Sequence, residues 1–149
     1  MRWLELRIPP MMLLLLFAAL AGLAKLLLPG WHFFGANFLA AGLVAVGVAV
    51  LLLGALAFRR AQTTLNPLHP EQSSRIVTRG IYRFSRNPMY LGFALLLAAL
   101  ALSHPVALAT LPCFIAYLNQ FQIKPEERAL LQKFGSEFAD YMLKVRRWL

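Results

Sequence analysis

Acidic residues are scarce in this 149-residue sequence, which has six Asp and Glu against fifteen Lys and Arg. A proton-coupled transporter normally needs an ionisable residue, usually acidic, inside the membrane. The acidic residues all lie outside the long apolar runs, at Glu5, Glu71, Glu126, Glu127, Glu137 and Asp140. This distribution disfavours a four-span transporter, which stays an alternative function together with a small non-enzymatic membrane scaffold.

Cysteine and histidine are also sparse, with one cysteine and three histidines. Cys113 stands inside an apolar run, and each histidine stands alone near the end of a segment, where capping or interfacial roles are common. One cysteine excludes an internal disulfide framework, and no cluster has the spacing of a metal site. We therefore expect no metal cofactor.

Charged residues are few as well. They make up only 14% of the sequence, whereas 60% of the residues are hydrophobic. A chain of this size cannot bury so much apolar surface in a soluble core, since small domains leave most of their surface exposed. The net charge of +9 does not point to nucleic acid, because the basic residues cluster between apolar runs instead of covering a face with stacking aromatics. We predict an integral membrane protein in contact with membrane lipid.

Four apolar runs predict transmembrane helices, at about residues 10–28, 35–58, 88–102 and 105–123. A span needs roughly 20 apolar residues, so the third run is short and requires little tilt or a locally thin bilayer. The second run carries Gly42, Gly47 and Gly54 among alanines. Small residues allow close approach of membrane helices, so we expect this helix to be central to the packing.

The first run has a second interpretation. A basic start, a leucine-rich stretch and Ala19-Leu20-Ala21 also fit a cleavable signal peptide. The apolar run continues past that point to Pro29, which favours a span, and the signal peptide stays open as the alternative.

Basic residues predict the topology. Except for Lys25, every Lys and Arg falls in the N-terminal segment, the loop 59–87 or the part after the fourth run. The positive-inside rule therefore places both termini and this loop in the cytoplasm. Apolar residues of the tail 125–149 recur at three- and four-residue spacing, which predicts one amphipathic helix on the cytoplasmic surface. The expected fold is all-α, a single domain over 1–149 with four transmembrane helices and this C-terminal cytoplasmic helix.

Two chemically dense stretches flank the last two runs. Residues 79–92 join arginines, tyrosines and Asn87-Pro88 at the entry to the third run, and residues 122–128 follow the fourth with Glu126-Glu127. Consecutive spans joined by a short turn pack antiparallel, so both stretches meet at the cytoplasmic face. A pocket there would open to water and to lipid, which suits a polar cofactor and a lipophilic acceptor.

These stretches resemble a known signature. Residues 77–82, 86–92, Glu126-Glu127 and Phe134-Gly135 are similar, in this order, to the integral-membrane methyltransferases that include isoprenylcysteine carboxyl methyltransferases and phospholipid N-methyltransferases. The similarity covers about residues 61–149. It implies S-adenosylmethionine as the cofactor and a multi-pass protein of a bacterial-type inner membrane. It also implies cofactor-binding residues, namely Ile76, Val77, Tyr82, Asn87, Pro88, Met89, Tyr90 and Glu126.

The resemblance further implies methyl transfer to a lipophilic or small acceptor, such as a phospholipid amine or a thiol. Gln122 stands where the isoprenylcysteine enzymes have an arginine for the substrate carboxylate, and a neutral amide cannot replace that pairing. A prenylcysteine acid is therefore not the expected acceptor. We predict acceptor contacts from Gln122, Asn66 and His69, and Glu127 as the general base if one is needed.

Overall fold

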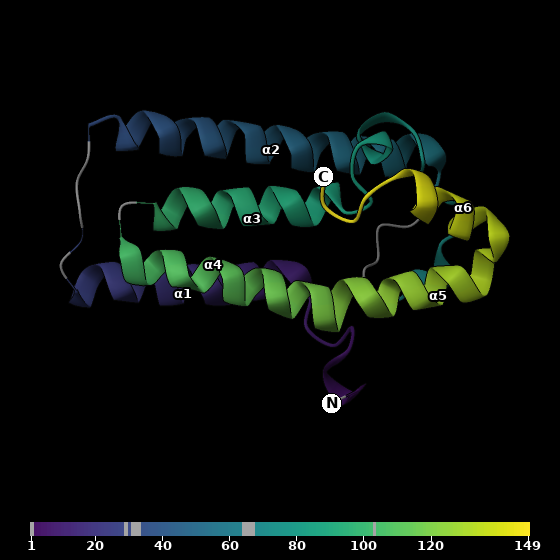
Figure 1. Cartoon of the computed structure of the whole chain (residues 1–149), viewed down its shortest axis with the longest axis horizontal. Coiled ribbons are helices and arrows are strands. Elements are labelled where there is room, and N and C mark those ends of the chain that lie inside the picture. The colour runs from purple at the N-terminus through teal and green to yellow at the C-terminus, as the bar shows by residue number, and fades with distance from the viewer. Residues whose placement is uncertain (1, 29, 31–33, 64–67, 103) are drawn as a thin grey trace.

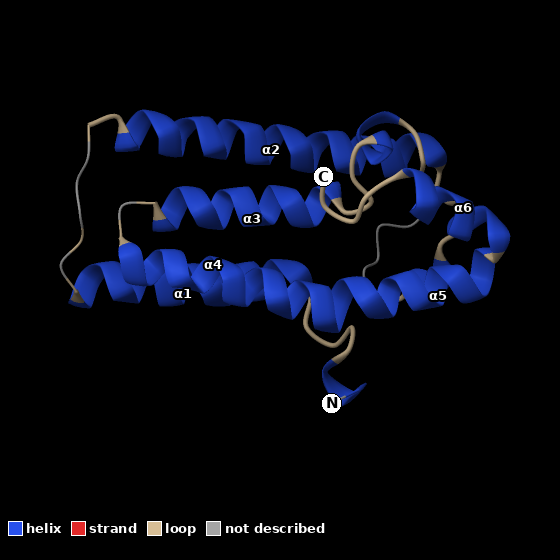
Figure 2. Cartoon of the chain, in the orientation of Figure 1, coloured by secondary structure: helices blue, strands red, loops and turns tan. Residues whose placement is uncertain are grey.

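The computed structural model is an elongated helical bundle with two shorter helices at one end (Figure 1). It describes all residues except 1, 29, 31–33, 64–67 and 103. The α-helices are α1 (Pro10–Leu27), α2 (Ala36–Ala61), α3 (Pro88–Ala101), α4 (Pro105–Leu118), α5 (Lys124–Phe134) and α6 (Ser136–Lys144). Helices and loops account for all the described residues in Figure 2, which confirms the all-α expectation over that part of the chain.

Three helical segments of the described chain are long and apolar enough to cross a membrane, so the expected set of four spans is met in part. They are Pro10–Leu27, Ala36–Ala61 and Pro105–Phe134, the last joining α4 and α5 through a π-helical turn at Asn119–Ile123. α3 has only 14 residues, or about 21 Å of helix against a hydrocarbon layer of about 30 Å.

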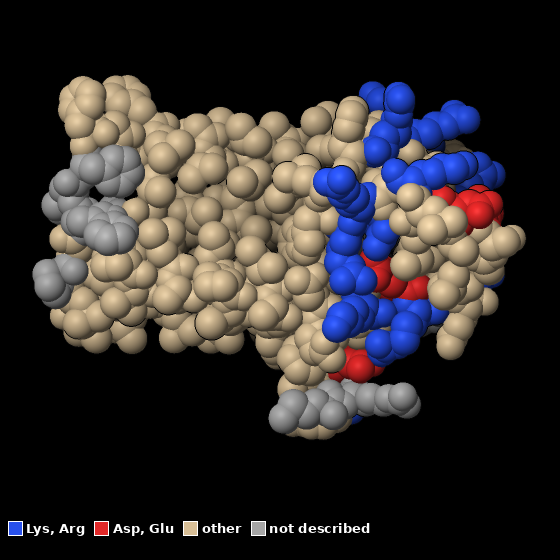
Figure 3. All heavy atoms as spheres, viewed as in Figure 1, with Lys and Arg blue, Asp and Glu red and all other residues tan. Residues whose placement is uncertain are grey.

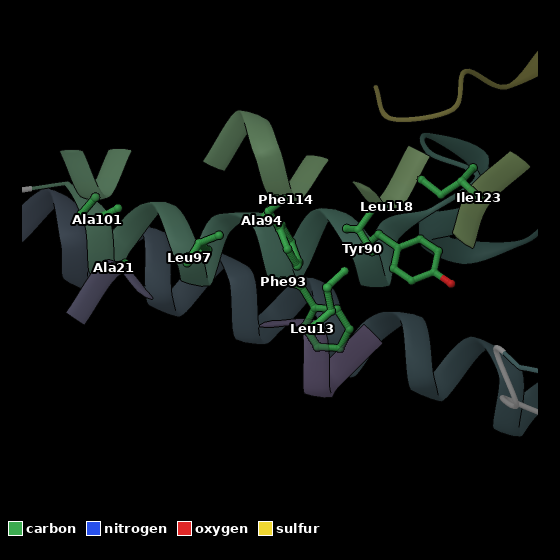
Figure 4. Close-up of a cluster of buried hydrophobic side chains, with 11 residues drawn as sticks. Leu13, Ala21, Tyr90, Phe93, Ala94, Leu97, Ala101, Phe114, Leu118 and Ile123 are labelled. Carbon is green, nitrogen blue, oxygen red and sulfur yellow. The ribbon is translucent and has the colours of Figure 1, made fainter. Parts of the chain in front are cut away.

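Although α3 is short, it is the most buried helix of the described chain. It packs against α1, α2 and α4, and Figure 4 shows its Phe93 and Leu97 side chains in the core with Leu13 of α1 and Phe114 of α4. Leu13, Leu97 and Phe114 are fully buried. α3 is thereby fixed against α1 and α2, which contribute further lining residues to the cavity described below.

Close approach of α2 and α3 depends on glycine. A Cβ at Gly92 would lie 2.7 Å from Leu51 Cγ, and one at Gly47 would lie 3.1 Å from Gly92 O. A Cβ at Gly54 would likewise collide with Met89, while a Cβ at Gly42 would meet open space. The expected packing role of the small residues in this helix is therefore confirmed at Gly47 and Gly54 and not at Gly42.

The prediction of one continuous tail helix over 125–149 is wrong. Gly135 has φ 55° and ψ −127°, a backbone conformation that is accessible mainly to glycine, and it separates α5 from α6. α6 ends at Lys144, and an extended segment then returns to the start of α3, where Figure 1 marks the C-terminus. The tail folds back over the bundle end.

Charged side chains gather at this same end. On the face visible in Figure 3, Lys, Arg, Asp and Glu cover the end formed by α5, α6 and the 68–87 loop. The N-terminal segment joins them, because Leu6 N donates to Phe121 O at 2.9 Å and Arg128 pairs with Glu5. The charged end therefore contains both terminal segments.

Candidate functional site

A cavity of about 270 Å³ lies at the charged end, among the starts of α1 and α3, the end of α2, and α5 and α6. Its lining residues come from segments far apart in the sequence. They are Pro9, Pro10, Met11, Phe58, Pro70, Ser73, Arg75, Ile76, Val77, Tyr82, Arg86, Asn87, Met89, Tyr90, Phe93, Glu126, Glu127, Leu130, Phe138 and Tyr141.

The structure brings most of the predicted cofactor residues together around this cavity. Those that line it are Ile76, Val77, Tyr82, Asn87, Met89, Tyr90 and Glu126, and the predicted base Glu127 also lines it. Pro88 is fully buried and does not line the cavity. It starts α3, where proline's missing N–H leaves no helical hydrogen bond unmade, so it fixes the direction of the lining residues that follow it.

The predicted acceptor residues do not gather in the same way. Gln122 is fully buried outside the cavity lining, and its Nε2 donates to Ile8 O at 2.7 Å. The reason is the π-helical turn, whose extra residue turns Gln122 out of line with Glu126. His69 is exposed and does not line the cavity, and Asn66 lies outside the described residues.

Tyr90 and Glu126 form the polar centre of the cavity. The buried Tyr90 donates from Oη to Glu126 Oε2 at 3.1 Å. Within the part of the chain that the structure describes, no Lys or Arg forms an ion pair with Glu126. A carboxylate withdrawn from water without a cationic partner is costly, so this position favours a ligand that carries positive charge.

Glu127, the next residue, points into a different network. Arg86 Nη2 donates to Oε1 at 2.7 Å, and Arg147 Nη2 donates to Oε2 at 2.6 Å. Arg86 also donates from Nη1 to Met142 O at 2.9 Å and to Val145 O at 2.6 Å. Both oxygens of Glu127 are thus occupied, and the carboxylate joins the segment before α3, α5 and the C-terminal segment.

The C-terminal segment completes this wall through main-chain contacts. Arg146 O accepts from Arg86 N at 3.0 Å, and Arg147 O accepts from Asn87 Nδ2 at 3.0 Å. Trp148 Nε1 donates to Asn119 Oδ1 at 3.1 Å. The predicted cofactor residue Asn87 is therefore oriented by its hydrogen bond to the C-terminal segment. No sequence motif predicts this contact.

Two tyrosines, Tyr82 and Tyr141, stabilise another part of the cavity wall. Tyr141 Oη donates to Tyr82 O at 2.7 Å, and the Tyr82 ring packs edge-on against Phe58 with centroids 5.4 Å apart. Burial, and to a smaller extent the Glu126 charge, raises the pKa of the Tyr82 phenol above its ordinary value. Burial also raises the pKa of Tyr141, against an opposing effect of Arg86. Both phenols therefore stay protonated at neutral pH, and the Tyr141 hydroxyl acts as a hydrogen-bond donor.

Sequence reasoning missed the lining residues contributed by α1, α2 and α6. Phe138 and Tyr141 belong to the apolar residues of the tail, and their three-residue spacing is the one signal in the sequence that could have found them. The break at Gly135 is what turns them toward the cavity. Among the described residues, no group of three or more His, Cys, Asp or Glu is placed to hold a metal ion.

Comparison with known proteins points to one family. Residues 36–137 match the sequence model of the family described as phospholipid methyltransferase. An uncharacterized protein of Haemophilus influenzae is 48% identical over 63 residues, which are 41% of this chain and 100% of that protein.

More distant relatives are named as enzymes. A probable protein-S-isoprenylcysteine O-methyltransferase, found in both the indica and the japonica subspecies of Oryza sativa, is 28% identical over 109 residues. The alignment covers 72% of this chain and 57% of the rice protein, so the chain spans little more than half the length of these relatives. No solved structure is significantly similar to the chain.

Proposed function

The chain belongs to the phospholipid methyltransferase family, whose members use S-adenosylmethionine, and on this basis we propose that its cavity binds that cofactor for methyl transfer to an acceptor at the cytoplasmic membrane face. The resemblance of the sequence motifs to this family is thereby confirmed. The observation that carries the proposal is the Glu126 carboxylate, which faces the cavity and has no ion pair among the described residues.

The residues of the cavity fit the chemistry of this cofactor. When bound, S-adenosylmethionine supplies a methyl group that its sulfonium charge has already activated. Glu126 offers a carboxylate for the positive charge of the ligand, and the rings of Tyr82 and Tyr90 add cation–π attraction. Apolar side chains of Val77 and Met89 provide a wall for the aromatic base.

Positioning explains how these residues would accelerate the reaction. Holding two reactants in line at near-attack distance can contribute about 7–11 kcal/mol to lowering a barrier. Tyr90 fixes the orientation of Glu126, while the Arg86–Glu127–Arg147 network fixes the entry to α3 and the C-terminal segment. These contacts hold the lining residues in place before any ligand arrives.

If the methyl acceptor is an amine, Glu126 is better placed than Glu127 to take its proton. Both oxygens of Glu127 accept from arginines, whereas Glu126 Oε1 makes no hydrogen bond among the described residues. The assignment of Glu127 as the base stays a prediction, and the geometry favours a positioning role for it. Because Pro9, Pro10 and Met11 at the start of a candidate span also line the cavity, a lipophilic acceptor has access from the membrane side.

The topology that we propose keeps four membrane crossings with both termini in the cytoplasm. The three long apolar segments are joined by α3 as a short fourth crossing, which packs against α1, α2 and α4. The charged end seen in Figure 3 is the cytoplasmic end.

A binding and transfer assay tests the proposed function. The full chain in lipid nanodiscs should bind labelled S-adenosylmethionine and transfer the label to a component of total membrane lipid or to a small thiol. Glu126→Gln should weaken cofactor binding about 10- to 100-fold, because it removes a charge-assisted contact. Glu137→Gln is the matched control, since Glu137 is exposed and does not line the cavity. Absence of binding, as expected for a scaffold or a transporter, or equal effects of the two variants, would overturn the proposal.

A further inference from the structure

A second cavity of about 570 Å³ lies beside the first, between the cytoplasmic end of α2 and the segment 75–81. Arg75, Ile76 and Val77 line both cavities, so this short stretch is their common wall. The remaining lining residues are Leu53, Leu56, Ala57, Arg60, Ala61, Thr78, Arg79, Gly80 and Ile81. We call this second cavity the arginine groove.

Three arginines line the arginine groove, one at the end of α2 and two in the segment 75–81. Arg60, Arg75 and Arg79 all line it, and their side chains are exposed. In the described segments, none of the three forms an ion pair, and no acidic residue lines the groove. Three like charges around one concavity raise the local concentration of anions.

Apolar side chains of α2 line the groove as well. Leu53 and Leu56 are 52% and 41% exposed, and they belong to α2, a candidate membrane span. Leucines at this position face the hydrocarbon layer, while the arginines face the headgroup region. A ligand that satisfies both the arginines and the leucines needs an anionic head and a hydrocarbon tail in one molecule, which excludes a free inorganic anion as the matching ligand.

We propose that the arginine groove binds an anionic membrane phospholipid, with the lipid phosphate at Arg60, Arg75 and Arg79 and an acyl chain along Leu53 and Leu56. Guanidinium groups bind phosphate through paired, charge-assisted hydrogen bonds, and the exposed Thr78 adds a hydroxyl donor. The arginines and leucines of this site, apart from Arg75, do not line the first cavity, and the proposal does not depend on the proposed methyl transfer.

The test measures lipid binding and not activity. The full chain in phosphatidylcholine nanodiscs is titrated with fluorescent phosphatidylglycerol, and the variant Arg60→Gln/Arg79→Gln is compared with Arg59→Gln/Arg83→Gln. The control pair removes the same charge from exposed residues that do not line the groove. Arg75 is left unchanged because it also lines the first cavity.

We expect the groove variant to weaken phosphatidylglycerol binding about tenfold or more, and the control variant to weaken it clearly less. Unlabelled phosphatidylglycerol should displace the probe, while inorganic phosphate at the same concentration should not. Thermal melting of each variant verifies that the chain is folded, and Arg60→Lys/Arg79→Lys, which keeps the charge, should retain part of the affinity. Equal loss in the groove and control variants would show a diffuse surface effect and overturn the proposal. Displacement by inorganic phosphate alone would also overturn it, in favour of a soluble anion.

Discussion

Arg86 and Glu127 are 41 residues apart in the sequence, yet Nη2 of the arginine donates to Oε1 of the glutamate at 2.7 Å. The bond connects the residue before Asn87-Pro88 to the first turn of α5. Arg147 occupies the second carboxylate oxygen at 2.6 Å, so one side chain joins three separate parts of the chain. The stability of the cavity wall is expected to depend on this carboxylate.

Removing that charge should destabilise the protein. Glu127→Gln leaves Arg86 without its ionic partner, at a position where both side chains are only 10% exposed. Breaking a pair of this kind typically costs about 3–5 kcal/mol. Glu5→Gln, which breaks the more exposed pair with Arg128, should cost about 0–1 kcal/mol. Unfolding in mixed micelles measures both values, and equal losses would show that the network does not stabilise the fold. If Glu127→Gln is instead stable and inactive, the general-base prediction for Glu127 regains support.

Deleting residues 145–149 should weaken cofactor binding. The deletion removes the acceptors of Arg86 N and Asn87 Nδ2 as well as the Arg147 contact to Glu127. We expect a loss of at least about tenfold, because mispositioned lining residues are costly at an ordered site. Equilibrium binding of labelled S-adenosylmethionine gives the value. Deletion of Leu149 alone, which is 70% exposed, serves as the control, and unchanged affinity in the longer deletion would contradict the positioning role of this segment.

Gly92→Ala should disturb the contact between α2 and α3. The added methyl group would lie 2.9 Å from Gly47 O and 2.7 Å from Leu51 Cγ, so one helix must shift. Overpacking of this kind costs about 1–3 kcal/mol. Gly42→Ala meets nothing within 4 Å and should change the stability by no more than about 1 kcal/mol, in the stabilising direction. Thermal melting in detergent compares the two, and similar melting temperatures would refute the close packing.

Tyr141→Phe should cost about 0.5–1.5 kcal/mol, since it removes the hydrogen bond to Tyr82 O. Tyr117→Phe is the matched control. The Tyr117 hydroxyl is buried without a hydrogen-bond partner among the described residues, so its removal should be neutral or stabilising. The same denaturation assay applies to both variants. A larger loss at Tyr117 than at Tyr141 would reverse the assignment.

Cysteine labelling tests the proposed topology. Gln72→Cys and Gly30→Cys, introduced singly into a Cys113→Ser background, place thiols at exposed positions near opposite ends of the bundle. An impermeant maleimide should label the first only from the cytoplasmic side and the second only from the outer side. Labelling of both from one side contradicts the four-crossing topology, and a shortened N-terminus in mass spectrometry would support the signal-peptide alternative.

The sequence by itself determined the all-α class of fold and the starts of α1 to α5 to within one residue. Apolar run length and proline placement predicted α1 and α3 to within a residue of their observed bounds, because proline at a first helical turn and a long apolar run act locally. Local chemistry also sufficed for the predicted cofactor residues between Ile76 and Tyr90, which line the cavity except for Pro88. The family resemblance could also be recognised from the sequence alone.

Tertiary structure alone decided which contacts each of the two adjacent glutamates makes. Neighbouring residues on a helix point about 100° apart, so Glu126 faces the cavity while Glu127 faces Arg86 and Arg147. The sequence could not assign these directions, because they depend on the π-helical turn before α5 and on the return of the C-terminal segment beyond Gly135. The same two features removed Gln122 from the cavity and brought Tyr141 into it, since packing between distant segments, and not local spacing, sets where each side chain lies.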